Sequence, residues 1–249
     1  MAARKLRADA ALVERGLAAS RSKAQALILA GKVFSGQRRI DKAGEGIKPD
    51  APLEVRGQDH PWVSRGGLKL DHALQHFAID PDAAVVLDVG ASTGGFTDVA
   101  LAHGAARVYA VDVGHGQLDW RLRNDPRVVV LERTNARYLT AEQVPEPVDL
   151  VVCDASFIGL QTILPAPMAL AGPHARLVAL IKPQFEVGRD RVGKGGVVRD
   201  PALHADVCDR IAAWLDACPG WRVVGVTPSP IKGPEGNVEF LIAAERVDD

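Results

Sequence analysis

Four charged residues stand where their side chains could meet and carry out chemistry. Asp154 follows the apolar run 151–153, Lys182 follows the apolar run 177–181, and Glu239 lies just inside the last apolar run of the chain. Ligands of open α/β sheets bind at the carboxyl ends of the parallel strands, so Asp154 and Lys182 should face one site. An antiparallel last strand would bring Glu239 to the same edge. Lys69, in the first turn of a predicted helix before the sheet, can complete the group.

A glycine-rich segment, 88–98, occupies the predicted turn between the first strand and the following helix. Glycines there let the backbone approach a ligand closely, next to an electropositive helix N-terminus. The spacing is GxxxGG rather than the GxGxxG that holds a dinucleotide pyrophosphate, so a nicotinamide or flavin enzyme is disfavoured. Asp112 ends the next strand, where a carboxylate can accept both hydroxyls of a ribose.

The glycine loop, Asp112 and Asp154 together resemble the S-adenosylmethionine pocket of Rossmann-like methyltransferases. The resemblance implies that S-adenosylmethionine is the cofactor. The residues expected to bind it are Gly90, Ala91, Ser92, Thr93, Gly94, Gly95, Phe96, Thr97, Asp112, Val113, Asn135, Ala136 and Asp154.

Alternating apolar strands and helical stretches must position these side chains. Continuous apolar runs are typical of strands buried on both faces of a parallel sheet, and they occur at 85–89, 108–111, 128–131, 150–153 and 177–181. Helices are predicted at 95–102, 116–123, 160–170 and 201–217. The pattern indicates an α/β fold with a Rossmann-like, doubly wound sheet. Two late strands, 222–226 and 238–243, should be antiparallel neighbours at one edge.

The first sixty residues differ from the rest in charge. The chain of 249 residues has a formal net charge of -1, but residues 1–60 hold 12 Lys or Arg against 7 Asp or Glu. That segment is therefore +5 and the remainder is -6. A small basic segment joined to a larger acidic one suggests a module that binds a polyanion.

Two short helices are predicted in this basic segment. Gly16 should end the first helix, Ser20 should cap the second, and Gly31 should end it. Short strands and turns follow near Val33, Ile40, Ile47 and 53–55. The pattern resembles an S4 RNA-binding domain, a small α+β fold, on the motifs 7–9, 12–16, 20–24, 31–33 and the single residues Ile28 and Lys42. The small polar turn that usually follows the valine strand is changed here to Phe34-Ser-Gly36.

The order Lys69, Asp154, Lys182, Glu239 resembles the catalytic tetrad of FtsJ-like ribose 2'-O-methyltransferases. The segments 64–69, 133–137, 182–188, 193–200 and 229–240 make the resemblance closer. An S4 domain fused to that tetrad is similar to the TlyA family, rRNA cytidine 2'-O-methyltransferases also labelled hemolysins. This resemblance covers essentially the whole chain.

The resemblance implies a role for each member of the tetrad. Lys182 would be the base or the group that steers the hydroxyl lone pair. Asp154 and Glu239 would orient Lys182, and Lys69 would place the substrate. Whether Lys182 is a true base or a positioning group is left open by the sequence.

Basic residues near both modules are the candidates for RNA contact, because Arg and Lys neutralise phosphates. We expect RNA binding by Arg4, Lys5, Arg7, Arg21, Lys23, Arg65, Arg133, Arg137 and Arg189. The loop 187–199 combines four glycines with basic side chains, and it is expected to be a mobile lid that clamps RNA.

The expected domain organisation is an S4-like domain at 1–58, a linker at 59–63 and a methyltransferase domain at 64–249. Pro61 restricts His60 to extended geometry, and Trp62 is expected to pack as an anchor between the two domains.

Composition removes several other classes of protein. No apolar run approaches the ~18 residues of a membrane span, and the basic N-terminus leads into no apolar core of a secretory signal, so a cytoplasmic protein without membrane contact is expected. Cys153, Cys208 and Cys218 show no spacing of a zinc site or a disulfide framework, so no metal is expected.

The leading hypothesis is an S-adenosylmethionine-dependent enzyme that methylates ribosomal RNA within ribosomal subunits, with cytidine as the target implied by the family. A catalytically inactive RNA-binding factor of ribosome assembly is one alternative, and a membrane-acting hemolysin is another. The modified nucleotide, the subunit that carries it and the oligomeric state are not readable from the sequence.

Overall fold

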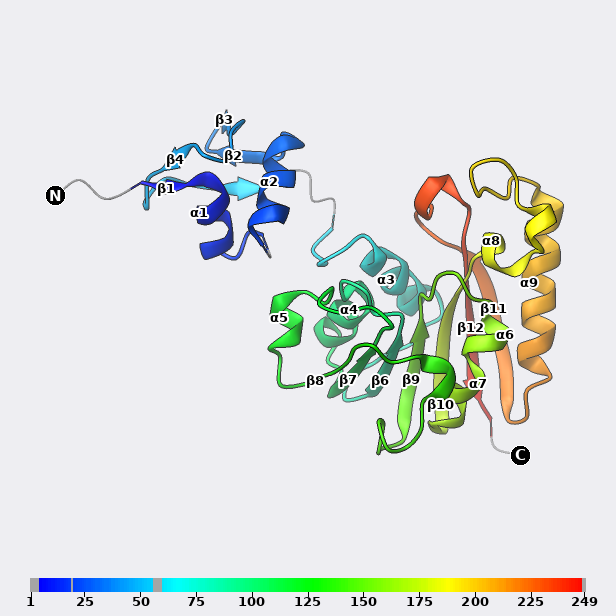
Figure 1. Ribbon diagram of the computed structural model, residues 1–249. Coiled ribbons are helices and arrows are strands. Elements are labelled where there is room, and N and C mark those ends of the chain that lie inside the picture. The colour runs from blue at the N-terminus through cyan, green and yellow to red at the C-terminus, as the bar shows by residue number, and fades with distance from the viewer. Residues whose placement is uncertain (1–4, 19, 56–59, 248–249) are drawn as a thin grey trace. The chain divides into compact units, whose positions relative to one another are not determined.

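The chain folds as two compact units. The computed structural model describes residues 5–18, 20–55 and 60–247, and the units comprise residues 1–61 and 62–249 (Figure 1). Each unit buries its own apolar core. The division between Pro61 and Trp62 falls inside the segment expected to be the linker, of which Asp59 lies outside the described residues.

The small unit contains two helices, α1 (Ala8–Glu14) and α2 (Arg21–Leu29), packed together. The Ser20 hydroxyl accepts a hydrogen bond from the Lys23 backbone N–H, so the predicted cap of the second helix is present. Short strands form two small sheets, β1-β4 and β3-β2-β5. Their bounds are β1 (Leu6–Arg7), β2 (Val33–Ser35), β3 (Arg38–Arg39), β4 (Gly46–Ile47) and β5 (Glu54–Val55). Ile40 follows β3 rather than lying within a strand, but it is fully buried in the core.

A seven-stranded sheet forms the centre of the large unit, in the order β11-β12-β10-β9-β6-β7-β8 (Figure 1). Five strands are parallel, and they are β6 (Val85–Val89), β7 (Arg107–Val111), β8 (Val128–Leu131), β9 (Val148–Cys153) and β10 (Ala171–Ile181). The last two, β11 (Trp221–Pro228) and β12 (Phe240–Arg246), are antiparallel to each other, and β12 is antiparallel to β10. The predicted Rossmann-like sheet with an antiparallel edge is therefore confirmed.

Helices cover both faces of this sheet. Val86, Leu150 and Val152 face the core under α3 (Gly66–His76) and α4 (Gly95–Ala102). The alternate residues Leu87 and Val151 face the opposite core, under α6 (Leu160–Ile163), α7 (Pro165–Ala169) and α9 (Pro201–Asp216). Burial of successive side chains on opposite faces explains why the strand sequences are continuously apolar.

Two predicted helices differ from those observed. The helix expected at 116–123 is reduced to α5 (Trp120–Arg123), because Gly116 has a φ of 70° and the Asp119 carboxylate caps the chain only at that point. The helix expected at 160–170 divides into α6 and α7, and Pro165 begins the second because it lacks a backbone N–H. The remaining short helices are η1 (Ala136–Tyr138), α8 (Pro183–Glu186), η2 (Arg189–Arg191) and η3 (Pro234–Gly236).

Trp62 packs within the large unit itself. A Cβ atom on Gly67 would lie 2.4 Å from the Trp62 Cγ, and the Trp62 ring lies 6.4 Å from the His103 ring. The Val63 backbone N–H donates to Asp98 at 2.8 Å. Trp62 therefore packs against the core of its own unit, and the expected anchor between domains stays a prediction.

Gly90 makes the closest backbone approach between the glycine loop and the end of β9. Its φ is 83°, and an added Cβ would lie 3.0 Å from the backbone of Ala155. The positive φ favours glycine. The short distance leaves no room for a methyl group unless the backbone next to Asp154 moves.

A Gly90→Ala variant should therefore lose about 2–4 kcal/mol of unfolding free energy, from left-handed strain plus overpacking. Gly116→Ala is the matched control, because Gly116 has a φ of 70° and open space around it, and it should cost about 1 kcal/mol. Urea unfolding of both variants measures the difference. Equal losses would show that the approach to Ala155 is not a constraint.

Candidate active site

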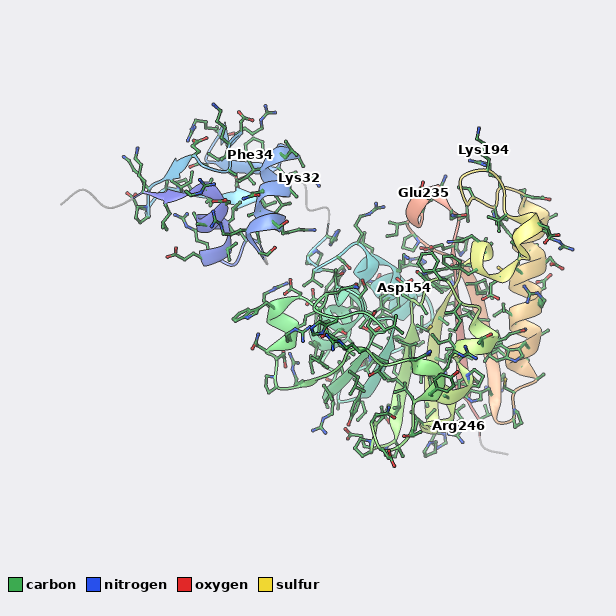
Figure 2. The ribbon with its side chains drawn as sticks, viewed as in Figure 1. Lys32, Phe34, Asp154, Lys194, Glu235 and Arg246 are labelled. Atoms are coloured by element: carbon green, nitrogen blue, oxygen red, sulfur yellow. The ribbon has the colours of Figure 1, made fainter. Side chains whose placement is uncertain are left out.

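The tetrad residues meet at the carboxyl ends of the parallel strands. Asp154 directly follows β9 and Lys182 directly follows β10. Because Ile181 pairs with Phe240, Glu239 is brought to the same edge from the antiparallel strand β12, which it precedes rather than enters. Figure 2 labels Asp154 at this edge of the sheet.

Two linked ion pairs organise the tetrad. The Lys182 ammonium lies 2.6 Å from Asp154 Oδ1, and the Lys69 ammonium lies 2.7 Å from Glu239 Oε2. Asp154 Oδ2 is also 3.4 Å from Lys69, so this carboxylate lies between the two lysines. All four side chains therefore form one connected cluster.

The pairing corrects one expected role. Glu239 contacts Lys69, whereas it was expected to orient Lys182. The reason is topological: β9 and β12 flank β10 on opposite sides, so Lys182 reaches towards the end of β9 while Lys69 approaches Glu239 from α3. Asp154 alone of the two carboxylates pairs with Lys182.

Burial makes this cluster costly to disturb. Lys69 and Lys182 are each 6% exposed and Glu239 is 1% exposed. A buried charge that loses its partner destabilises a protein strongly. Gly233 approaches so closely that an added Cβ would clash with Glu239 Oε1. This oxygen has no hydrogen-bond donor among the described residues.

Lys182 has further partners that the sequence reasoning missed. Its ammonium donates to the Asp154 carbonyl oxygen at 3.1 Å and to the Ser156 hydroxyl at 2.9 Å. These two hydrogen bonds add to the ion pair with Asp154 Oδ1 and hold the ammonium group in place. A hydroxyl residue two positions after a carboxylate at a strand end is the signal that could have identified Ser156.

The glycine loop and three members of the tetrad line a cleft of about 370 Å³. The loop residues on its wall are Gly90, Ala91, Ser92, Thr93, Gly95 and Phe96, and the other lining residues include Lys69, Asp154, Ser156 and Lys182. Gly94 and Thr97 do not line the cleft. Gly94 approaches Leu118 and Leu122, and Thr97 is fully buried.

The other cofactor candidates lie at the ends of β7 and β8. Asp112 accepts hydrogen bonds from the Ser92 and Gly114 backbone N–H groups at 2.8 and 2.6 Å, which ties the glycine loop to the next strand. Each carboxylate oxygen has two acceptor positions, so capacity for ribose hydroxyls remains. The Val113 side chain is exposed.

Asn135 and Ala136 have structural roles that the sequence did not indicate. The Asn135 side-chain oxygen accepts from the Arg137 backbone N–H at 3.1 Å and so caps η1. The Ala136 side chain is buried in the core on the α6 and α9 face of the sheet. The Ala136 side chain is thus committed to the core, whereas Asn135 is exposed and uses its side-chain oxygen as a cap.

Asp88 is a buried carboxylate that sequence reasoning left without a role. It is fully buried in β6, and the Thr97 hydroxyl donates to its Oδ2 at 2.7 Å. Burial raises the pKa of Asp88 to about 7, and the nearby charge of Asp154 contributes in the same direction. Its place inside an otherwise apolar strand is the sequence signal that could have identified Asp88 as an unusual carboxylate.

The basic candidates separate into three groups. Arg65 lines the cleft, and Arg133 and Arg137 are exposed near the end of β8, with the Arg137 guanidinium 5.4 Å from the Tyr138 ring centre. The RNA-binding candidates of the small unit that the structure describes are all exposed, and they are Lys5, Arg7, Arg21 and Lys23. Arg4 and the side chain of Arg189 lie outside the described residues.

The loop expected to be a mobile lid is hydrogen-bonded at its C-terminal half. The Asn237 side chain accepts from the Val198 N–H at 3.1 Å and donates to the Gly196 carbonyl at 3.0 Å. His204 also contacts the Val198 carbonyl oxygen at 2.9 Å. The buried amide of Asn237 thus ties this loop to the segment that carries Glu239. Figure 2 labels Lys194 and Glu235 on these two segments.

Two aromatic residues follow the catalytic strand ends. Phe157 is 90% exposed and has a φ of 66°, and its ring lies 5.0 Å from that of Phe185. Left-handed backbone in a bulky residue costs free energy and often marks a functional site. Phe157 carries no periodic signal in the sequence, because it lies in a loop.

An Asp88→Asn variant should change how stability depends on pH. Asp88 is harder to ionise in the folded state, so its contribution to stability is present below about pH 4 and is lost as pH rises through 7. Between pH 4 and 8, wild type should lose up to roughly 4 kcal/mol more unfolding free energy than the variant. Urea titrations at several pH values measure this, with the exposed Asp206→Asn as control. Parallel curves for wild type and Asp88→Asn would contradict the expectation.

Within the described ranges, no helix is long and apolar enough to cross a membrane, and no three His, Cys, Asp or Glu side chains are grouped as metal ligands.

Comparisons with known proteins agree with this architecture. The family described as FtsJ-like methyltransferase matches residues 62–246, and the S4 domain matches residues 6–52. The 16S/23S rRNA (cytidine-2'-O)-methyltransferase TlyA of Mycobacterium tuberculosis is 53% identical over 241 residues, which are 96% of this chain and 90% of that protein. Hemolysin A of Brachyspira hyodysenteriae is 42% identical over 237 residues, 95% of this chain and 98% of that protein.

A solved structure from Streptococcus thermophilus, which carries a provisional hemolysin name, has a TM-score of 0.75 and 41% identity. It covers 99% of this chain, and this chain covers 90% of it. With an S4 domain, a doubly wound sheet and a Lys-Asp-Lys-Glu cluster beside a glycine-loop cleft, the chain belongs to the FtsJ-like methyltransferases, in the S4-containing TlyA family.

Proposed function

We propose that this protein transfers a methyl group from S-adenosylmethionine to a ribose 2'-hydroxyl of ribosomal RNA, with cytidine as the target nucleotide. The observation that carries the proposal is the cluster of two linked ion pairs on the wall of the cleft that the glycine loop forms. The TlyA relative named above supports the choice of rRNA and cytidine. Because the substrate is ribosomal RNA, we place the activity in the cytoplasm, on ribosomal subunits.

The residues around the cleft fit the cofactor. The wall from Gly90 to Phe96 presents backbone and small side chains, which a nucleoside and an amino-acid moiety can approach closely. Asp112 does not line the cleft, but it accepts a hydrogen bond from the backbone N–H of Ser92 on the cleft wall, and its remaining acceptor capacity suits ribose hydroxyls. Asp154 lines the cleft as the acidic partner of Lys182. When bound, S-adenosylmethionine would supply an activated methyl group that passes to the hydroxyl oxygen as the carbon–sulfur bond breaks.

The chain's own residues act mainly by aligning the RNA hydroxyl. Lys182, held by Asp154 and Ser156, presents its ammonium group from the cleft wall, where it can steer a lone pair of the hydroxyl oxygen. Because the ion pair with Asp154 and the hydrogen bond to Ser156 fix the ammonium on the cleft wall, we assign Lys182 mainly a positioning role. Lys69, held by Glu239, would place the ribose or its phosphate.

Division of labour between the units follows from their charge. We propose that residues 1–58 dock RNA, that 59–63 link the units, and that 64–249 carry the cofactor site and the chemistry. Arg65, Arg133 and Arg137 would supply local phosphate contacts on the acidic catalytic unit. An inactive assembly factor or a lytic protein is not favoured, because neither function needs four charged side chains buried together beside such a cleft.

Lys182→Ala should reduce the turnover of methyl transfer by about 10²–10⁴-fold, because the hydroxyl would lose its positioning group. Cofactor affinity should stay within a few fold. The experiment follows transfer of labelled methyl from S-adenosylmethionine to purified ribosomal subunits and maps the blocked 2'-hydroxyl. The exposed Glu142→Ala, outside the cleft and the RNA-binding candidates, is the surface control and should leave transfer unchanged. Near-normal transfer by Lys182→Ala with intact cofactor binding would refute its assigned role, and wild type that methylates neither subunit would refute the function.

Phe157→Ala should lower kcat/KM for the subunit by about 10–100-fold while leaving cofactor affinity unchanged. The reason is that an exposed aromatic ring at the catalytic strand end suits stacking with an unstacked base, which contributes about 1–3 kcal/mol. Phe157→Tyr keeps a ring and should retain most of the activity. A Phe157→Tyr variant as impaired as Phe157→Ala would argue against stacking.

A further inference from the structure

A buried carboxylate in the small unit holds two exposed arginines. Asp9, in the first turn of α1, is 0% exposed. Its Oδ1 accepts from Arg7 Nε at 3.0 Å, and its Oδ2 accepts from Arg7 Nη2 at 3.1 Å, so this pair is bidentate. The same Oδ2 accepts from Arg21 Nη2 at 3.0 Å and from Gln25 Nε2 at 2.9 Å.

The arrangement fixes the two guanidinium groups side by side. Arg7 lies in β1 and Arg21 begins α2, yet both Nη2 atoms contact one oxygen atom. A planar bidentate pair restricts the guanidinium far more than a single contact does. The two groups are therefore held at a spacing short enough to contact the same phosphate.

Both arginines keep donors for a ligand. Their side chains are 54% and 58% exposed, although the carboxylate that holds them is fully buried. A guanidinium has five N–H donors, and Asp9 takes two from Arg7 and one from Arg21. The pair keeps a net charge of +1 after Asp9 is counted, and Lys5 and Lys23 are exposed in the same segment.

We infer that Asp9 is a positioning residue that presents Arg7 and Arg21 as a rigid pair for one backbone phosphate of the RNA. The inference rests on the proposed RNA-docking function of the small unit and specifies how its surface is built. Preorganisation matters because two free arginine side chains would lose rotamer freedom on binding, and here that loss occurs when the protein folds.

Simple electrostatics and positioning by Asp9 predict opposite changes in RNA affinity when the Asp9 charge is removed. Replacing Asp9 by Asn adds one positive charge to a basic surface, so a surface that binds RNA by charge alone should bind more tightly. Positioning by Asp9 predicts weaker binding. The sign of the change therefore separates the two explanations.

The test measures binding of the full chain to deproteinised ribosomal RNA at several salt concentrations. Asp9→Asn should weaken binding about 10-fold and reduce the slope of log affinity against log salt by about 1, as expected for one lost phosphate contact. Asp41→Asn is the matched control, because Asp41 pairs with Arg39 but is exposed, and it should bind no more weakly than wild type. Folded Asp9→Asn protein that binds as well as wild type, or more tightly, would overturn the inference.

If Asp9→Asn unfolds the small unit, a variant that leaves the net charge unchanged tests the inference instead. Arg7→Lys keeps a cation beside Asp9 but removes the planar fork, and it should weaken binding about 5-fold or more. Arg39→Lys is its control and should have no effect. Equal binding by Arg7→Lys and wild type would also overturn the inference.

A combined variant separates a failure of this inference from a failure of the proposed docking function. Arg7→Gln with Arg21→Gln should weaken RNA binding, and adding Asp9→Asn to it should cause no further loss, because Asp9 acts through these arginines. A further loss would indicate a structural role for Asp9 and contradict the inference alone. Unchanged binding by the double arginine variant would contradict RNA docking by this surface, and the inference with it.

Discussion

The antiparallel pairing of β12 with β10 is the constraint on which the catalytic cluster depends. Of the tetrad, the five parallel strands bring only Asp154 and Lys182, which follow the carboxyl ends of β9 and β10, to the edge that forms the cleft. Because β12 runs in the opposite direction, with Phe240 opposite Ile181, the residue before its start lies at that same edge. Glu239 can then receive Lys69 from α3, and the second ion pair forms.

Burial gives this cluster its rigidity and its energetic cost. Four charged side chains with little exposure are stable only while each keeps its partner, since an unpaired buried charge is strongly destabilising. Asp154 lies between both lysines, so movement of one pair changes the electrostatics of the other. Such interdependence suits an enzyme whose main task is to align a hydroxyl with an already activated methyl group.

Both units use a carboxylate with little exposure to hold cationic side chains. In the large unit, Asp154 holds Lys182 at the wall of the cleft, and in the small unit Asp9 holds Arg7 and Arg21 at the surface. The two arginine side chains stay exposed and available to a polyanion, whereas the Lys182 ammonium is buried. Guanidinium groups suit phosphate because they are planar, whereas an ammonium suits a single oxygen.

Sequence alone determined the features that depend on residue order. Apolar runs predicted the strands, Gly90 and its neighbours marked the ligand loop, and Ser20 marked a helix start, because periodicity, φ preference and capping act over a few residues. Tertiary structure decided which charges pair: Glu239 with Lys69, Ser156 with Lys182, and Asp9 with two arginines. These contacts join residues up to 170 positions apart. Such partners are chosen by strand order and by the direction in which side chains leave the sheet, which no local pattern encodes.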